Sequence, residues 1–251
     1  MLRKLLYGGA GWLALSVLLP YQSAAQSIIN SDSLAVAAAV AVATQQYTKD
    51  VRPESVLFNG QEYVNYSQPN TIGHQFFESP DPQQGAIIYR GAFFRAVPLS
   101  YDLARDQVVM TYPNQLATII LVPEEVTAFS LGSHQFVRVA ADSATRAALP
   151  TGYYELLLPG PVSLLARRTK KTEQTTVQQN LRLEFRQTDK LIVRTPSAAA
   201  EVTSLKDLLA LLPAHKPEVQ RYARQQELRF SAAQREASAL SVLRYYYTLP
   251  Q

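Results

Sequence analysis

The chain has 251 residues, a formal net charge of +4 and no cysteine. The small charge argues against nucleic acid as a partner, and the missing cysteine excludes a disulfide framework and the lipidated cysteine of a bacterial lipoprotein. With 47% hydrophobic and 18% charged residues, the composition is typical of a folded globular protein rather than of a disordered one.

The first 25 residues have the pattern of a secretory signal peptide. Arg3 and Lys4 give a positive start, residues 5–19 form an apolar run, and small residues precede an expected cleavage before Gln26. The alternative is a retained membrane anchor, but the run is shorter than the roughly 20 apolar residues that cross a bilayer. We therefore expect an exported chain with no transmembrane span after cleavage. Removing Arg3 and Lys4 lowers the net charge from +4 to +2, which predicts no strongly electrostatic partner.

Residues 26–55 are expected to form an N-terminal helix and a linker. The helix is predicted over the Ala/Val run 34–43, because alanine is the best helix former and Asp32 or Ser33 can cap it.

Residues 56–203 predict an antiparallel β domain. Short stretches rich in Val, Ile, Tyr, Phe and Thr alternate there with Gly, Pro, Asn and Asp, which is typical of successive strands and hairpins. The turns include Pro159-Gly160 and Thr188-Asp189. The expected strands are 86–89, 93–99, 107–112, 117–122, 135–139, 153–158, 162–167, 181–186 and 191–195. A meander, a sandwich and an open barrel all fit this pattern.

Residues 204–251 predict two or three amphipathic helices. The first begins at Ser204, where Asp207 completes a capping-box-like pattern, the second begins at Pro217, and the third follows Ser231. The apolar positions expected to share a face are 205, 208, 209 and 212, then 219, 222 and 223, then 237, 240, 243 and 247. Such faces need an apolar surface to cover them, and the β domain is the nearest one. We therefore expect an α+β fold with the helices packed on the β domain.

The histidines and serines do not form a recognisable catalytic or metal motif. His74, His134 and His215 lie in three separate segments, none at the i, i+4 spacing of a helical metal site, and no G-x-S-x-G sequence occurs. Ser133 precedes His134, but neighbours on a strand point to opposite faces. We expect neither a metal nor a cofactor.

Paired carboxylates are the remaining catalytic candidates. Asp102 and Asp106 bracket a short polar turn, and Glu124-Glu125 opens the next strand. Two acids at a defined separation can hydrolyse glycosides, although acids at turns usually accept hydrogen bonds from backbone amides. We interpret them as turn residues.

The densest positive charge follows the apolar strand 162–167. Its cations are Arg167, Arg168, Lys170 and Lys171. One interpretation is a solvated strand end or hairpin tip, where lysines also discourage edge pairing. The functional interpretation is a contact for phosphate-bearing surface lipid or an acidic polymer, since clustered cations act together.

Several short motifs, in order along nearly the whole mature chain, resemble a family of uncharacterised secreted proteins common in Bacteroidota. They are Leu57-Phe58-Asn59-Gly60-Gln61-Glu62-Tyr63, Gly73-His74 with Phe76-Phe77, Val97-Pro98-Leu99 with Tyr101-Asp102 and Asp106, Phe136-Val137-Arg138, Gly152-Tyr153-Tyr154-Glu155, Arg167 with Lys170, Ser204-Leu205 and Tyr245-Tyr246. The resemblance implies a shared fold and a Gram-negative envelope setting, which is periplasmic, outer-membrane-associated or extracellular. It implies no activity and no catalytic residue.

Together these features favour a non-enzymatic envelope protein that binds or scaffolds another envelope component, either a protein or a lipid. One alternative is a carrier that holds a small apolar ligand or lipid inside a barrel-like interior. The other is a hydrolase of envelope polymers. That hypothesis predicts a cleft in which Asp102, Asp106 or a histidine converges with other polar groups.

Overall fold

The computed structural model of the chain describes residues 57, 59–67, 71–112, 117–141, 148–177, 180–212 and 214–250. The predicted signal peptide, residues 1–25, and the predicted helix 34–43 lie outside the described residues.

The described strands form one open twelve-stranded sheet, with the order β1-β6-β5-β4-β3-β7-β8-β9-β10-β11-β12 and β2 paired to β11. All pairs are antiparallel except β2 with β11. The strands are β1 (Gln61–Glu62), β2 (Thr71–Ile72), β3 (Gln83–Tyr89), β4 (Ala92–Asp102), β5 (Gln107–Thr111), β6 (Thr118–Ile120), β7 (Val126–Leu131), β8 (His134–Val139), β9 (Gly152–Leu158), β10 (Ser163–Val177), β11 (Asn180–Arg194) and β12 (Ala199–Glu201). The predicted α+β class and its antiparallel sheet are therefore confirmed.

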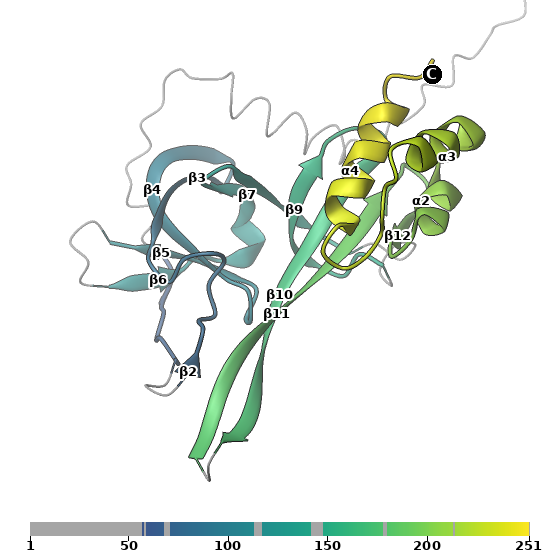
Figure 1. Cartoon of the computed structure of the whole chain (residues 1–251). Coiled ribbons are helices and arrows are strands. Elements are labelled where there is room, and N and C mark those ends of the chain that lie inside the picture. Colours follow the sequence, from purple (N-terminus) through teal and green to yellow (C-terminus); the bar gives the residue numbers. More distant parts are fainter. Residues whose placement is uncertain are drawn as a thin grey trace, which may run out of the picture.

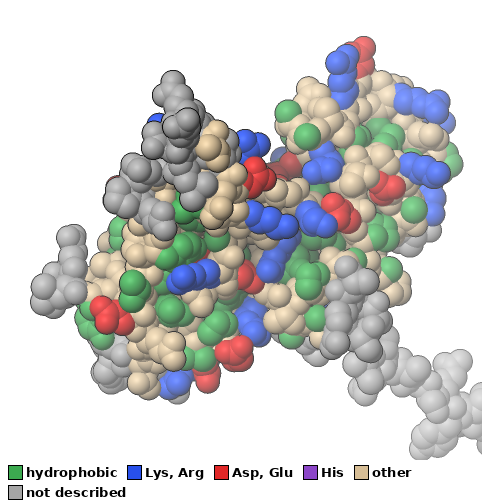
Figure 2. Space-filling view, turned by 90° about the horizontal axis from the view of Figure 1, so that it is seen from below, with side chains coloured by type: hydrophobic (Ala, Val, Ile, Leu, Met, Phe, Trp, Pro, Cys, Tyr) green, Lys and Arg blue, Asp and Glu red, His purple; other side chains and the backbone are tan. Residues whose placement is uncertain are grey.

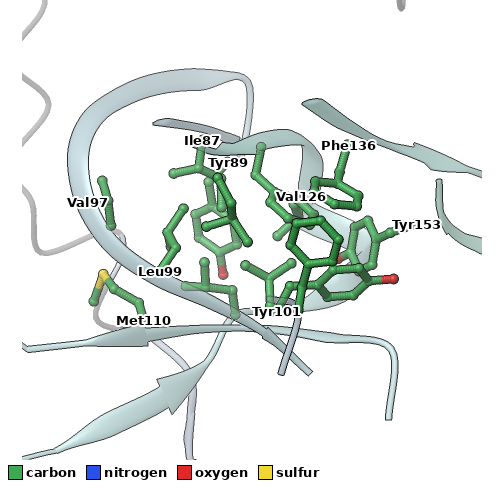
Figure 3. Close-up of a cluster of buried hydrophobic side chains, with 14 of the residues drawn as sticks. Ile87, Tyr89, Val97, Leu99, Tyr101, Met110, Val126, Phe136 and Tyr153 are labelled. Carbon is green, nitrogen blue, oxygen red and sulfur yellow. The ribbon is translucent and has the colours of Figure 1, made fainter. Parts of the chain in front are cut away.

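The first strands curl around an aromatic core (Figure 1). Alternate residues of β3, β4 and β5 point inward, as the two-residue period of a strand requires, and β7, β8 and β9 add residues that include Phe129, Phe136 and Tyr153. Tyr101 makes edge contacts with Phe129, Phe136 and Tyr153 at ring-centroid distances of 5.3, 5.2 and 5.7 Å. Phe129 and Phe136 stack at 4.8 Å. Figure 3 shows side chains from these strands pointing toward one another, so the interior of the curl is filled with side chains.

The turn predicted at Pro159-Gly160 joins β9 to β10. Gly160 has a φ of 141°, and a Cβ atom there would overlap the Tyr247 hydroxyl. That hydroxyl donates to the carbonyl of Val162 and accepts from its amide, both at 2.9 Å. The turn therefore needs glycine because the end of the C-terminal helix is tied to it.

The sequence-based interpretation of β10 and β11 needs two corrections. The cations from Arg167 to Lys171 do not end a strand, because β10 continues to Val177. The reversal expected at Thr188-Asp189 is also wrong, since both residues lie inside β11, paired with Thr169 and Arg168. Polar residues interrupt the apolar pattern, but the backbone ladder runs through them.

Three helices follow the sheet, namely α2 (Leu205–Leu211), α3 (Lys216–Gln225) and α4 (Arg235–Tyr246). They cover the upper half of the β10–β11 hairpin (Figure 1). The joint core includes Leu164 and Val193 from the hairpin and Leu208, Val242 and Tyr246 from the helices. No helix in this part of the chain has both the length and the apolar character needed to cross a bilayer.

The capping box predicted for the first helix is present. The Ser204 hydroxyl accepts a hydrogen bond from the Asp207 amide, and the Asp207 carboxylate accepts from the amides of Thr203 and Ser204. The Thr203 hydroxyl also donates to this carboxylate at 2.8 Å. The hydrogen bonds from Thr203 and Ser204 lower the pKa of Asp207 to about 2.

The apolar face predicted for the third helix is rotated in the structure. Leu243 is buried as predicted, together with Val242 and Tyr246, whereas Ala237 is exposed and Leu240 and Tyr247 are half-buried. In the second helix Val219 and Ala223 are buried as predicted. The difference arises because α4 packs on both α3 and the hairpin, which buries a broader face than one row of residues.

Candidate functional site

The cations predicted to contact an anionic lipid or polymer lie in the middle of β10, where the sheet, the hairpin and α4 meet. Arg168 is the centre of this junction, and its side chain is only 10% exposed. Its guanidinium contacts carboxylate oxygens of Glu155 at 2.6 Å, Asp189 at 2.9 Å and Glu236 at 2.8 Å. Burial alone would lower the pKa of Arg168, but these acids raise it above its ordinary value. Arg168 thus joins β9, β10, β11 and α4.

The same network continues through Glu155 to a histidine. One Glu155 oxygen lies 2.6 Å from Nδ1 of His134 on β8, and Nε2 of His134 lies 3.2 Å from a Glu78 oxygen. Both ring nitrogens therefore face carboxylates. In a catalytic triad the second nitrogen would face a nucleophile. Here it faces Glu78, so the contacts of His134 are those of a structural link.

A second ion pair lies close by and uses Arg167. Its guanidinium contacts Asp106 at 2.8 Å and donates to the carbonyl of Tyr153 at 3.1 Å. Asp106 also accepts a hydrogen bond of 2.6 Å from the Tyr101 hydroxyl. A Cβ atom at Gly152 would overlap this pair, and the φ of 150° there also favours glycine. The predicted acid Asp106 therefore anchors β9 and β10 to the turn after β4.

Lys170 is bound to backbone rather than to acids. Its ammonium donates to the carbonyls of His74 and Phe76 at 2.9 and 2.6 Å. Burial lowers the pKa of Lys170. It also lowers the pKa of His74, and the nearby charge of Lys170 adds to this effect. Lys171, the fourth predicted cation, is exposed.

Asp102 is fully buried at the end of β4. Its carboxylate accepts hydrogen bonds from the hydroxyls of Tyr63 and Tyr66 and from the amides of Ala104 and Arg105. Burial, and then the Asp102 charge, raise the pKa of Tyr66 well above its ordinary value. The amide bonds are those of a turn residue, as predicted, and the tyrosine bonds hold the segment 63–66 against β4.

Asp102, Asp106, His134 and His215 therefore each have structural partners of their own. Asp102, Asp106 and His134 belong to three separate hydrogen-bonded groups, and Nε2 of His215 lies 2.6 Å from the carbonyl of Pro250. Within the described residues, no group of three or more acids, histidines or cysteines is placed to hold a metal ion.

A shallow apolar hollow lies over β3, β4, β7 and β8. It has a volume of about 200 Å³ and opens to solvent, and its lining includes Ile88, Phe93, Arg95, Ala128 and Gln135. The guanidinium of Arg95 lies 5.3 Å from the Phe93 ring centroid. Ile87, Phe129 and Phe136 of the aromatic core also line the hollow.

The far end of the β10–β11 hairpin, residues 171–177 and 180–186, is a long two-stranded extension of the sheet, which we call the arm. It projects away from the curled sheet and from the helices (Figure 1). Lys171, Thr172, Glu173, Gln174 and Thr176 are all exposed. Seen from the side toward which the hairpin points, acidic and basic side chains are interspersed over the middle of the molecule (Figure 2).

The two edges of the arm differ. On β11, Leu183 and Glu184 pair with Thr71 and Ile72 of β2. On β10, the amide of Lys170 donates to the carbonyl of Leu103 at 3.2 Å. Beyond Lys170, β10 has no strand partner other than β11 within the described residues. The arm therefore has one covered edge and one open edge.

Comparisons with protein-family models, with curated proteins and with solved structures find no match. The resemblance to secreted Bacteroidota proteins stays a prediction.

The arm was not predicted from the sequence. The sequence does carry a pattern for one half of the arm, since apolar Leu181, Leu183 and Phe185 alternate with polar residues. The expected strand 181–186 covers this β11 half, but no strand was expected over the polar run 172–176 that pairs with it. No apolar pattern marks 172–176 as a strand, because residues 172–174 and 176 are exposed.

Proposed function

We propose that the protein is an exported, non-enzymatic binding or scaffold module of the cell envelope, and that the outer edge of β10 in the arm is its docking surface. The observation that carries the proposal is the open edge itself. Natural sheets usually protect such edges with charged side chains, especially lysine, or with a bulge, a proline or a covering segment. From residue 171 to residue 177, β10 carries one lysine, Lys171, and it pairs with β11 without a bulge or a proline.

The junction at Arg168 supports this function by holding the base of the arm in place. Arg168 and Lys170 tie β10 to β9, to β11, to α4 and to the segment before β3. A docking strand that is ordered before binding loses less conformational entropy when the partner arrives. Addition of an extended strand to an open edge then supplies affinity through backbone hydrogen bonds.

The other functions have less support. A carrier needs an apolar interior, whereas the sheet is open and its curl is filled by aromatic side chains. A hydrolase needs convergent polar groups, whereas Asp102 and Asp106 accept hydrogen bonds from separate structural partners. Anionic lipid is the second candidate ligand for the predicted cations, but Arg167, Arg168 and Lys170 are bound within the protein and only Lys171 is exposed.

Site-specific photo-cross-linking in intact envelopes tests the proposal. A photoreactive residue at position 174 is expected to capture one protein species. The same residue at Gln226, which is exposed beside α3 far from the arm, is expected to capture none.

A backbone variant provides the control for the docking mode. Thr172→Pro removes one backbone donor from the open edge. The hydrogen bonds to β11 remain, because the amide of Thr172 points away from β11, as the amide of Lys170 does two residues earlier. We expect this variant to abolish capture from position 174. Capture that persists in Thr172→Pro, or that is equal from Gln226, would contradict the proposal.

A further inference from the structure

The backbone groups that the open edge presents follow from two hydrogen bonds. The amide of Lys170 donates away from β11, to Leu103, and the carbonyl of Leu191, the partner of Ala166, accepts from the amide of Val202, which follows β12. Along an antiparallel strand, the N–H and C=O groups of successive residues point alternately to the two neighbouring strands. Both hydrogen bonds show that the even-numbered residues of β10 point these groups outward, away from β11. Thr172, Gln174 and Thr176 therefore present unpaired donors and acceptors, and no described residue bonds to them outside the β10–β11 pair.

We infer that the edge binds a second copy of this chain, through antiparallel pairing of the two β10 strands about a twofold axis at Gln174. This inference rests on the proposed function and names the partner for the same surface. In this register Gln174 lies opposite Gln174, and Thr172 lies opposite Thr176 of the other copy. All three outward residues of each strand are then paired, which gives about six backbone hydrogen bonds.

The sequence of the edge suits this self-pairing. Lys171 and Glu173 lie opposite positions 177 and 175 of the other copy, which carry no charge, so no like charges lie directly opposite each other. Threonine pairs on neighbouring strands are favourable. An interface symmetric about one axis closes at two copies and does not propagate into a filament.

Other registers on this edge leave outward groups unpaired. A twofold at Thr172 would bring position 170 opposite 174, but the amide of Lys170 already bonds to Leu103 and its side chain to the carbonyls of His74 and Phe76. A twofold at Thr176 would leave Thr172 without a partner within the ordered ladder. The register at Gln174 is the one that uses the whole open stretch. Because this stretch is short, we expect the dimer to be weak and concentration-dependent.

Single-cysteine cross-linking measures this register, because the chain has no cysteine of its own. Gln174→Cys places two thiols opposite each other in a hydrogen-bonded pair, where the Cα atoms are about 5.5 Å apart and within disulfide range. Arg182→Cys is the matched control. It is exposed on β11 of the same arm, and in the dimer three strand spacings, about 14 Å, separate it from its copy. We expect a disulfide dimer from Gln174→Cys and at least tenfold less from Arg182→Cys.

A charge pair tests the twofold without a covalent bond. Gln174→Lys and Gln174→Glu should each lose the dimer in sedimentation, because like charges meet at the axis, and an equimolar mixture should recover it. The side chain is exposed, so thermal melts should match the wild type. Equal cross-linking at positions 174 and 182, or no recovery on mixing, would overturn the inference. If envelope photo-cross-linking from position 174 then captures a different protein, the proposed function stands. If it captures nothing, the proposed function fails as well.

Discussion

Arg168→Met is expected to lower the free energy of unfolding by about 3–5 kcal/mol, because it removes the guanidinium from the buried carboxylate of Glu155 and leaves His134 as its partner. Glu155 is 5% exposed and contacts the guanidinium at 2.6 Å. Removing the cation also leaves Asp189 and Glu236 facing Glu155 with no positive charge between them. Urea unfolding at neutral pH measures the change.

Arg186→Met is the matched control on the same hairpin. Arg186 is 56% exposed and forms ion pairs with Glu173 and Glu184, and exposed pairs contribute about 0–1 kcal/mol. Adding Glu155→Gln to Arg168→Met should recover part of the loss, since it removes the buried charge that has lost its guanidinium partner. If Arg168→Met were no more costly than Arg186→Met, the junction could not be what fixes the base of the arm.

Phe136→Ala is expected to cost about 3–5 kcal/mol, the range for removing a large buried aromatic side chain. Phe136 is 1% exposed and contacts Phe129, Tyr101 and Phe77 at ring-centroid distances of 4.8, 5.2 and 5.1 Å. The loss combines the removed apolar area with a cavity that the surrounding rings fill only in part. Thermal and urea unfolding measure it.

Phe93→Ala provides the comparison for the aromatic core. Phe93 is 36% exposed at the surface hollow, so we expect a loss below about 1 kcal/mol. Similar losses for the two variants would mean that the curl is not filled as Figure 3 shows.

Features set by neighbouring residues were predictable from the sequence. The capping box at Ser204 and Asp207 and the glycine turn at Gly160 both appear where their local patterns place them. Each depends on contacts or backbone angles within a few residues, which a sequence pattern encodes directly. The antiparallel class followed in the same way from short strands separated by turn residues.

Features set by distant residues were not predictable. Thr188 and Asp189 have the composition of a turn, yet they continue β11 because Asp189 pairs with Arg168 across the hairpin. The cations of β10 look solvated in the sequence, but the acids that bind them lie 13 to 68 positions away, at Glu155, Asp106 and Glu236. Only the assembled sheet brings these residues together.

The β10 half of the arm also could not be predicted from the sequence. Residues 171–174 and 176 of this half are exposed, so the period-two pattern that reveals other strands is missing there. The ladder with β11 defines it instead. An edge that the fold holds rigid at its base and leaves open at its end is the feature on which the proposed function depends.

Amide hydrogen exchange along β10 is the most direct test of this central claim. In dilute solution, the amides of Thr172, Gln174 and Thr176 should exchange rapidly, and those of Lys171 and Glu173, which bond to β11, should exchange slowly. Raising the protein concentration, or adding envelope extract that contains the captured partner, should slow the first three amides and leave the other two unchanged. Slow exchange at all five amides in dilute solution, or rapid exchange at the first three under every condition, would contradict an open docking edge.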